Sequence, residues 1–367
     1  MNERYAKQTI LPEIGLVGQA RIGAGRVLCV GAGGLGCAVL PYLAGAGIGR
    51  ITIIDNDRVD RTNLQRQVLF GESSLDQPKA VAAARRLRDL NPDIDIQAID
   101  ARLDLDNVED LLLAHDIIVD GSDNYATKYL VADACVKYDR PLVYGSVTGM
   151  EAMVTVFHAG HGPCLRCLFP QAPTGWVPNC AEAGVLGSLV GMTGALQASE
   201  VIKLLVGSEQ GLQGLIGRLW VMDARDGQSR LMAVRRGKNC PTCTRPSSEI
   251  TLQAAQRPVL REIGVSEAQS LSDWPFLDVR EPDEFAAGHI PGALNLPLSQ
   301  LQSGRIRPPP ESRCVLYCES GVRCKTAAEI LQRFDYQDIR GLRGGLPAWQ
   351  AAGNPHSHPE QGVMHEQ

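Results

Sequence analysis

The stretch RVLCVGAGGLG, from Arg26 to Gly36, joins an apolar run to a loop with four glycines in six positions. The apolar run predicts a buried strand, and the glycines predict a tight turn that opens a helix from about Gly34 to Gly47. ITIID, from Ile51 to Asp55, predicts the next strand and ends on an acidic residue. Such a loop lets the backbone and a helix N-terminus meet a phosphate, while the acid accepts from ribose hydroxyls. Alone, the pattern distinguishes neither NAD from ATP nor a nucleotide site from a merely tight turn.

The segments after this loop continue the alternation of strand and helix. They predict a helix near 78–90 and strands at 94–99, 116–120 and 141–145. Alternation of this kind is typical of a parallel sheet with crossover helices. We therefore expect an α/β protein whose first domain is a Rossmann-like, doubly wound fold.

Length and composition predict two domains joined by a linker. A chain of 367 residues exceeds one ordinary hydrophobic core. The polar stretch TRPSSEITLQAAQRP after Cys243 lacks periodicity, which predicts a linker. We expect a first domain at 1–245, a linker at 246–260, a smaller α/β domain at 261–355 and a flexible tail at 356–367. The smaller domain is predicted to contain strands at 274–279 and 313–318 and a helix at about 322–334.

Charge and hydropathy exclude several kinds of partner. The net charge is -5 and no basic block occurs, so we expect no nucleic-acid partner. The first eight residues are polar and do not resemble a secretory signal, which favours a cytoplasmic protein. The uncharged stretch from Ala183 to Ser199 is interrupted by glycines and closed by Glu182 and Glu200. It predicts a closely packed buried helix rather than a membrane span.

Polar residues that follow the predicted strands decide which nucleotide chemistry fits. A dehydrogenase does not need two cations and several carboxylates around one nucleotide, whereas a reaction at a phosphate does. In that reaction Arg66 and Lys79 would stabilise phosphoryl charge and Asp123 would hold Mg²⁺. The polar positions at the predicted site are Asp57, Asn63, Arg66, Lys79, Asp123 and Asn124.

The chain contains 11 cysteines, which in a large cytoplasmic protein indicates metal ligands or thiol chemistry. Cys164 and Cys167 form one C-x-x-C pair, and Cys240 and Cys243 form another. Together they supply four thiolates for one structural Zn²⁺. A redox role is the alternative, but neither pair is expected to leave a strand and open a helix as in thioredoxin.

Two further cysteines are candidate nucleophiles. Cys180 lies directly before the uncharged helix, whose dipole would favour a thiolate. Cys318 leaves a predicted strand and is followed by a helix, so backbone N–H groups converge on its sulfur. The loop Cys318 to Arg323 is one residue shorter than that of cysteine phosphatases, which favours sulfur over phosphate.

The motifs GAGGLG, DNDRVDRTNLQRQ, QPK and DGSDN, in this order, resemble the MoeB/ThiF family, relatives of ubiquitin-activating enzymes. The resemblance covers about Arg4 to Cys243. It implies ATP-dependent adenylation of the C-terminal glycine of a ubiquitin-fold sulfur carrier, a homodimer, and the same four-cysteine zinc. It also implies that the loop glycines Gly31, Gly33, Gly34 and Gly36 and Asp55 hold the nucleotide, that Asn63, Arg66 and Lys79 hold phosphates, and that Asp123 binds Mg²⁺.

One position departs from the family pattern. Members usually carry Arg-Tyr-x-Arg-Gln near the N-terminus, and the second arginine reaches into the partner subunit's site. Here the segment reads Arg4-Tyr5-Ala6-Lys7-Gln8. Lys7 keeps the charge but lacks the planar fork that grips phosphate in two places. Either Lys7 suffices or Arg4 takes the larger part.

The second half resembles a rhodanese from about Arg261 to Gln350, through DVRE, GHIPGA, CESGVR and GGLPAW. This resemblance implies that Cys318 carries sulfur as a persulfide and that Arg323 binds the donor or the persulfide. Asp278, Arg280 and His289 are interpreted as structural. Cys324 stands where a small residue, commonly serine, usually follows the arginine. Its thiol could resolve an acyl disulfide, protect Cys318 by pairing with it, or be inert and partly buried.

Together the two halves predict adenylation of a carrier that ends in Gly-Gly, followed by attack of the Cys318 persulfide to give a thiocarboxylate. Cys180 or Cys324 would then cleave the acyl disulfide. A cysteine desulfurase is one possible sulfur donor. Molybdopterin synthesis is the preferred pathway among molybdopterin, thiamine, tRNA-thiolation and cysteine-type carriers. The alternatives are an activating enzyme for a ubiquitin-like conjugated modifier and a noncatalytic scaffold for carrier and desulfurase.

Overall fold

The computed structural model describes residues 3–171, 184–253, 260–334, 336–355 and 357. The described residues form two compact units, the first running to 253 and the second starting at 260. Each unit is built on its own sheet.

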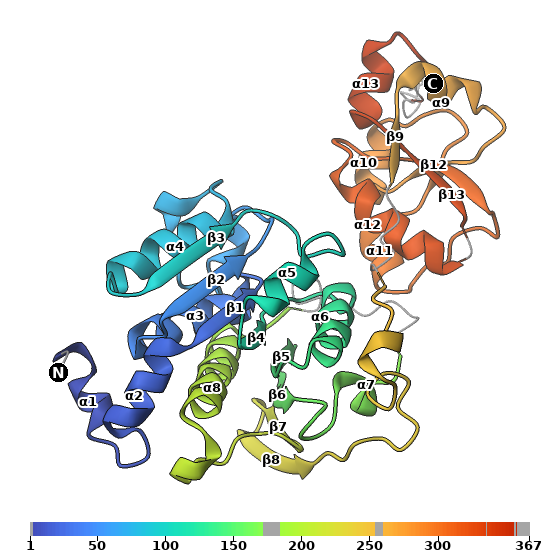
Figure 1. Cartoon of the computed structure of the whole chain (residues 1–367). Helices are drawn as coiled ribbons and strands as arrows, with labels where there is room; N and C mark the ends of the chain where they lie inside the picture. Colours follow the sequence, from blue (N-terminus) through green and yellow to red (C-terminus); the bar gives the residue numbers. More distant parts are fainter. Residues whose placement is uncertain (1–2, 172–183, 254–259, 335, 356, 358–367) are drawn as a thin grey trace, which may run out of the picture. The chain divides into compact units, whose positions relative to one another are not determined.

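The first unit contains an eight-stranded sheet in the order β3-β2-β1-β4-β5-β6-β7-β8 (Figure 1). Strands β1 to β5 pair in parallel, whereas β6, β7 and β8 are added antiparallel. The strands are β1 (Arg26–Val30), β2 (Arg50–Ile54), β3 (Asp95–Ile99), β4 (Ile117–Asp120), β5 (Leu142–Thr148), β6 (Glu151–Phe157), β7 (Arg218–Asp223) and β8 (Gln228–Ala233).

The first unit also contains α-helices, of which α3, α4, α6 and α8 pack on the sheet. They are α1 (Ala6–Thr9), α2 (Gly15–Ala24), α3 (Gly34–Ala46), α4 (Lys79–Leu90), α5 (Val108–Leu113), α6 (Tyr125–Lys137), α7 (Leu165–Leu168) and α8 (Gly187–Val206). The predicted Rossmann-like fold is therefore confirmed. The strand order reverses at β1 and β4, and ligands of doubly wound sheets bind at the carboxyl ends of strands beside such a point.

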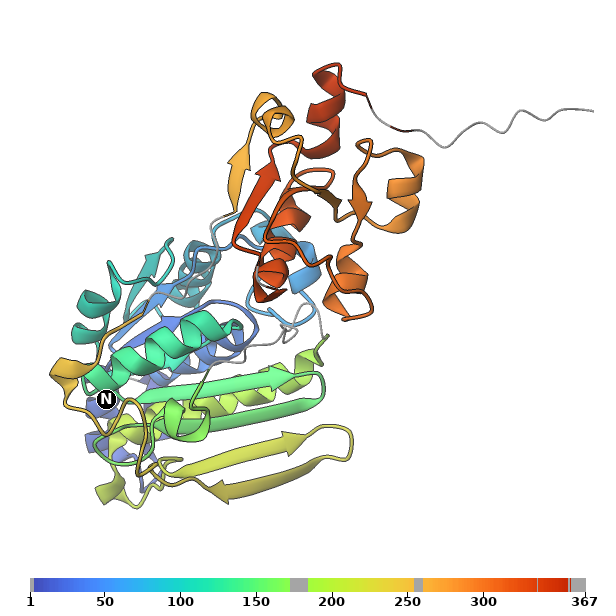
Figure 2. The ribbon, with the colours of Figure 1, turned by 90° about the vertical axis from the view of Figure 1, so that its right-hand side faces the viewer.

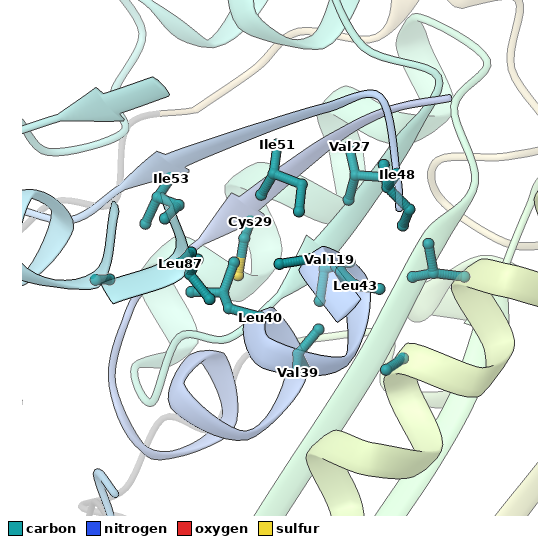
Figure 3. Close-up of a cluster of buried hydrophobic side chains, with 14 of the residues drawn as sticks. Val27, Cys29, Val39, Leu40, Leu43, Ile48, Ile51, Ile53, Leu87 and Val119 are labelled. Carbon is teal, nitrogen blue, oxygen red and sulfur yellow. The ribbon is translucent and has the colours of Figure 1, made fainter. Parts of the chain in front are cut away.

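Strand β1 shows why a continuous apolar run folds into the middle of a sheet. Its side chains alternate, and both faces are covered by helices. Val27 and Cys29 pack in one core cluster. Leu28 and Val30 belong to a second cluster that contains residues of α6. Figure 3 shows the first cluster, in which α3 contributes Val39, Leu40 and Leu43.

The uncharged stretch forms α8, which packs against α3, β5 and β6; Figure 2 shows its yellow-green ribbon alongside the green strands. The two helices approach closely, because a Cβ on Gly194 would lie 2.5 Å from Ala38 Cβ. Glu200 was expected to end the uncharged run, but the helix continues past it. The carboxylate is tolerated inside the protein because it accepts from the Leu215 backbone N–H at 2.6 Å. Among the described residues α8 is the one helix long and apolar enough to cross a membrane, and half of its most apolar window is buried.

The antiparallel extension of the sheet was not predicted. Strands β5 and β6 are joined by a two-residue turn, Gly149-Met150, and Thr148 pairs with Glu151. Gly149 has φ of +57°, a conformation that glycine adopts readily. Every residue of β8 is exposed, so this edge strand lacks the apolar alternation by which strands are found in a sequence.

The second unit contains a five-stranded parallel sheet in the order β11-β10-β12-β13-β9. Its strands are β9 (Arg261–Ile263), β10 (Phe276–Asp278), β11 (Leu294–Asn295), β12 (Arg313–Tyr317) and β13 (Asp338–Leu342). Its helices are α9 (Val265–Ser270), α10 (Pro282–Ala287), α11 (Leu298–Gln302), α12 (Val322–Leu331) and α13 (Gly345–Ala351).

The central strand β12 is buried on both faces. Cys314 and Leu316 pack in one cluster, and Val315 and Tyr317 pack in the other. Cys318 follows the last residue of this strand and lies at its carboxyl end. Cys318 is thus placed at the carboxyl end of a parallel strand, as the glycine loop is in the first unit. Ligands of parallel sheets bind at these ends.

Candidate functional site

The glycine loop between β1 and α3 has a backbone that side chains would block. Gly31 has φ of +95°, and a Cβ on it would lie 2.9 Å from the Gly121 carbonyl oxygen. A Cβ on Gly36 would lie only 2.1 Å from the Gly31 carbonyl oxygen. Gly33 is the N-cap of α3 and Gly34 its first residue, so the helix N-terminus opens at this loop. This arrangement suits a phosphate group.

Asp55, at the end of β2, is held against the glycine loop. Its Oδ2 accepts from the Ala32 backbone N–H at 2.7 Å, and its Oδ1 accepts from the Asp57 N–H at 2.7 Å. Burial raises the pKa of Asp55, and the two backbone hydrogen bonds act against that rise. A carboxylate has about four acceptor positions, so two remain for ribose hydroxyls.

Lys79 and Asp57, both predicted at the nucleotide, form an ion pair with an Nζ–Oδ2 distance of 3.0 Å. Lys79 is the first residue of α4 and is 5% exposed, whereas the Asp57 side chain is 65% exposed. The lysine is therefore held in place by its partner. Both residues follow β2 in the chain, with the charge of the buried lysine paired to Asp57.

Arg66 and Asn63 lie in the segment after β2. The Cγ of Arg66 lies 3.8 Å from the position of a Cβ on Gly34, so its stem crosses the first turn of α3. The Arg66 guanidinium donates to the Thr62 carbonyl oxygen at 3.3 Å, and Asn63 Nδ2 lies 3.3 Å from Thr62 Oγ1. The structure thus brings Arg66 beside the glycine loop.

Asp123 and Asn124 follow β4 in a loop that contacts the glycine loop, since a Cβ on Gly121 would lie 2.7 Å from the Gly31 carbonyl oxygen. Asp123 is exposed. Asn124 Oδ1 caps α6 by accepting from the Thr127 N–H at 2.9 Å. This capping bond occupies the Asn124 oxygen and leaves its amide N–H groups to meet a ligand.

Sequence reasoning missed a buried ion pair beneath this loop. Asp120 is 0% exposed and its Oδ2 lies 2.8 Å from Lys128 Nζ. Lys128 also donates to the Gly145 carbonyl oxygen at 3.0 Å and lies 4.7 Å from the Tyr144 ring centroid. Asp120 Oδ1 accepts from the Ser122 N–H, which fixes the loop that carries Asp123. The acid at the end of β4 and a lysine two turns later are its only trace in the sequence.

Gln67 is a second residue that sequence reasoning did not assign. It is 3% exposed, and its Oε1 has no hydrogen-bond partner among the residues that the structure describes. Its Nε2 lies 3.9 Å from the position of a Cβ on Gly33. Buried amide groups are normally satisfied, so an unpartnered oxygen beside the loop fits a site that receives a ligand donor.

Arg4 and Lys7, the two cations of the N-terminal segment, have different surroundings. Arg4 donates to the carbonyl oxygen of Leu90, the last residue of α4, at 2.9 Å and forms an ion pair with Asp93, beyond the helix. Cations are favoured at a helix C-terminus, so Arg4 has a structural role within its own chain. Lys7 is exposed.

The two C-x-x-C pairs meet in one cluster whose Sγ atoms all lie within 4.8 Å of one another. The Sγ–Sγ distance is 3.4 Å between Cys164 and Cys240 and 3.5 Å between Cys167 and Cys243. Tetrahedral zinc with Zn–S bonds of about 2.3 Å separates its sulfurs by about 3.8 Å. The four cysteines therefore fit zinc. Cys164 does precede the four-residue helix α7, as in a redox motif. However, each cysteine of one pair lies against a cysteine of the other pair, which a two-cysteine redox motif does not require.

Cys318 lies in a loop that stabilises a thiolate. Its Sγ accepts from the Gly321 N–H at 3.0 Å. The Cys324 thiol lowers the pKa of Cys318 most; burial opposes this, while the N–H groups of Ser320, Cys324 and Gly321 add to it, giving a value of about 5. The backbone at Cys318 is also held by α13, because the Leu346 N–H donates to the Cys318 carbonyl oxygen at 3.0 Å. Cys318 is therefore a thiolate at neutral pH.

Arg323, predicted to bind donor or persulfide, forms a two-point ion pair with Glu284 of α10 at 2.5 and 2.8 Å. This pairing lowers the pKa of Glu284 to about 2. Glu284 also accepts from the Glu281 N–H in a capping box, so the arginine is tied to the start of α10. Sequence reasoning missed Glu284, although the spacing of Glu281 and Glu284 is that of a capping box.

The residues interpreted as structural make contacts of that kind. Arg280 and Asp278 form a buried ion pair, with Nη2 and Oδ2 at 2.7 Å, and Arg280 also donates to the Gly288 carbonyl oxygen. His289 stacks on Phe285 with ring centroids 3.9 Å apart. Cys180, the other candidate nucleophile, lies outside the described residues.

Comparison with known proteins matches the two halves of the chain to two different families. Residues 5–242 match the model of the ThiF family, and residues 265–352 match the rhodanese-like domain. The chain is 37% identical to the probable adenylyltransferase/sulfurtransferase MoeZ of Mycobacterium tuberculosis over 94% of this chain and 92% of that one. It is 36% identical to the adenylyltransferase and sulfurtransferase MOCS3 of Bos taurus over 95% and 85%.

The first unit also has relatives on its own. The sulfur carrier protein adenylyltransferase of Thermus thermophilus is 44% identical over 66% of this chain and 90% of that protein. The crystal structure of E. coli MccB with MccA-N7isoASN superimposes with a TM-score of 0.57 at 24% identity, over 66% of this chain and 75% of that one, and shares the fold. The chain belongs to the ThiF family and carries a C-terminal rhodanese-like domain.

Proposed function

We propose that this protein adenylates the C-terminal carboxylate of a ubiquitin-fold sulfur carrier and converts it to a thiocarboxylate with sulfur held on Cys318. The observation that carries the proposal is the Cys318 loop, where backbone N–H groups and a neighbouring thiol hold a buried thiolate in a chain that also carries the glycine-loop site. The relatives named adenylyltransferase and sulfurtransferase combine the same two activities in one chain.

In the first step the carrier carboxylate oxygen attacks the α-phosphorus of ATP, and pyrophosphate leaves. Backbone N–H groups at Gly33 and Gly34 and the cations Arg66 and Lys79 would stabilise phosphoryl charge. Asp123 would hold Mg²⁺, which neutralises phosphate charge when bound. Its carboxylate is exposed, and the preceding residues Gly121 and Ser122 contact the glycine loop, which suits such a cation.

In the second step the Cys318 persulfide attacks the acyl adenylate and AMP leaves. An adenylate is a mixed anhydride, and a persulfide is a strong sulfur nucleophile. Arg323, held by Glu284, would contribute positive charge at the mouth of this loop. A single zinc ion in the cysteine cluster would have a structural role, because four thiolates leave no open position for a substrate.

The partners follow from the same chemistry. The carrier must end in an accessible carboxylate, and the family resemblance implies that this terminus is Gly-Gly. We further propose a homodimer in which the exposed Lys7 reaches the neighbouring site, a sulfur donor such as a cysteine desulfurase, and a cytoplasmic location. Molybdopterin synthesis remains the preferred pathway for the carrier.

Two assays test the proposal together. Pyrophosphate exchange that requires a Gly-Gly carrier measures adenylation, and mass spectrometry of the carrier measures sulfuration. A carrier linked to a target by an isopeptide bond would support the rival conjugation enzyme. Failure of exchange with every carrier, with tight carrier binding retained, would support the scaffold.

A further inference from the structure

The second unit holds a second thiol beside Cys318. Cys324 lies in the first turn of α12, and both cysteine side chains are buried. Cys318 and Cys324 pack in the same buried cluster, at the two ends of a loop in which the Gly321 N–H donates to Cys318 Sγ at 3.0 Å. The Cys324 side chain is also the strongest influence that lowers the pKa of Cys318, in keeping with a thiol near Cys318 Sγ. A thiol this close to a sulfur atom needs little movement to attack it in a thiol–disulfide exchange.

The two thiols share one negative charge, which is located on Cys318. The hydrogen bond to Cys318 and burial both raise the pKa of Cys324, so Cys324 stays protonated while Cys318 is a thiolate. Once Cys318 Sγ enters a disulfide, its negative charge is gone. The loop N–H groups and the N-terminus of α12 remain, and they then favour a thiolate on Cys324. Cys324 is thereby activated only after Cys318 has reacted.

We infer that Cys324 is the resolving cysteine, which releases the sulfurated carrier from Cys318 by forming a Cys318–Cys324 disulfide. This inference rests on the proposed function and adds a dithiol–disulfide step to it. The other candidate resolver, Cys180, becomes an outcome of the test.

Attack of the Cys318 persulfide on the adenylate expels AMP and leaves the carrier as an acyl disulfide, C(=O)–S–S–Cys318. Cys324, after losing its proton to solvent, attacks Cys318 Sγ. The S–S bond of the acyl disulfide breaks, and its electron pair leaves with the outer sulfur as the carrier thiocarboxylate. The two cysteines lose two electrons in total, and a dithiol reductant restores them for the next turnover.

The test is a single turnover without reductant. The protein is loaded with thiosulfate, freed of excess donor, and mixed with carrier, ATP and Mg²⁺. Trypsin cuts after Arg313, Arg323 and Lys325, so a Cys318–Cys324 disulfide joins the peptides CVLYCESGVR and CK. We compare the wild type with Cys324→Ser, whose hydroxyl preserves a hydrogen-bond donor. Cys314→Ala, a buried cysteine in the same peptide, is the matched control.

The wild type and Cys314→Ala are expected to release free thiocarboxylate and to yield the joined peptides. Cys324→Ser is expected to load sulfur but to lose release, keeping the carrier as an acyl disulfide until dithiothreitol is added. Release by Cys324→Ser at the wild-type rate, or a Cys180–Cys318 disulfide in the wild type, would overturn the inference alone. If the wild type sulfurates no carrier at all, the proposed function fails and the inference fails with it.

Discussion

Replacing Cys324 by alanine removes the thiol that most lowers the pKa of Cys318. A hydrogen bond to a charged group contributes about 1.5–3 kcal/mol, and one pKa unit corresponds to about 1.4 kcal/mol. Its loss therefore raises the pKa of Cys318 by roughly one to two units, from about 5 to about 6–7. The backbone donors stay in place, so the pKa remains below that of a free thiol.

The assay is the pH dependence of alkylation of Cys318 by iodoacetamide, followed by mass spectrometry of the tryptic peptide CVLYCESGVR. Only the thiolate reacts, so the rate falls as pH drops through the pKa of Cys318. The alanine variant should lose reactivity at a higher pH than the wild type. Cys324→Ser keeps a donor and should shift less. An unchanged midpoint in the alanine variant would refute this account of the thiolate.

Three further predictions concern the nucleotide site, the buried ion pair and the pH dependence of stability. Asp123→Ala should abolish pyrophosphate exchange while zinc, measured by metal analysis, is retained; unchanged exchange would exclude its role with Mg²⁺. Lys128→Met leaves the buried carboxylate of Asp120 unpaired and should lower the free energy of unfolding by about 3–5 kcal/mol in urea titrations, a loss that Asp120→Asn in the same chain should reduce. The folded pKa of Cys318 lies below that of an unfolded thiol, so its thiolate stabilises the second unit above about pH 8.5, and this contribution is lost as pH falls towards about 5. Cys318→Ser should therefore flatten the pH dependence of stability over that range, and an unaltered profile would contradict the assigned thiolate.

The parts of the fold that the sequence predicts well are those with continuous apolar strands and glycine punctuation. The strands beginning at Arg26 and Arg50 and the helix beginning at Gly34 are near their predicted bounds, because buried strands and a helix-opening glycine loop leave clear patterns. The antiparallel strands β6 to β8 were missed. Their edge member is exposed along its whole length and carries no pattern that distinguishes it from a loop.

The candidate site shows a similar division. Residues whose side chains are themselves reactive or bind metal, such as Cys318 and the two C-x-x-C pairs, can be found from residue type and spacing. Supporting residues cannot, because their importance depends on a contact distant in sequence. Glu284 matters through Arg323, 39 positions away, and Gln197 through its bond to the Asp120 carbonyl oxygen, 77 positions away.

The central claim is that Cys318 is the sulfur source for the adenylated carrier. Its most direct test is mass spectrometry of a Gly-Gly carrier incubated with ATP, Mg²⁺, a persulfide donor and either the wild type or Cys318→Ser. We predict that the wild type replaces one carboxylate oxygen of the carrier by sulfur, whereas Cys318→Ser adenylates the carrier and stops there. Equal thiocarboxylate formation by both proteins would contradict the account.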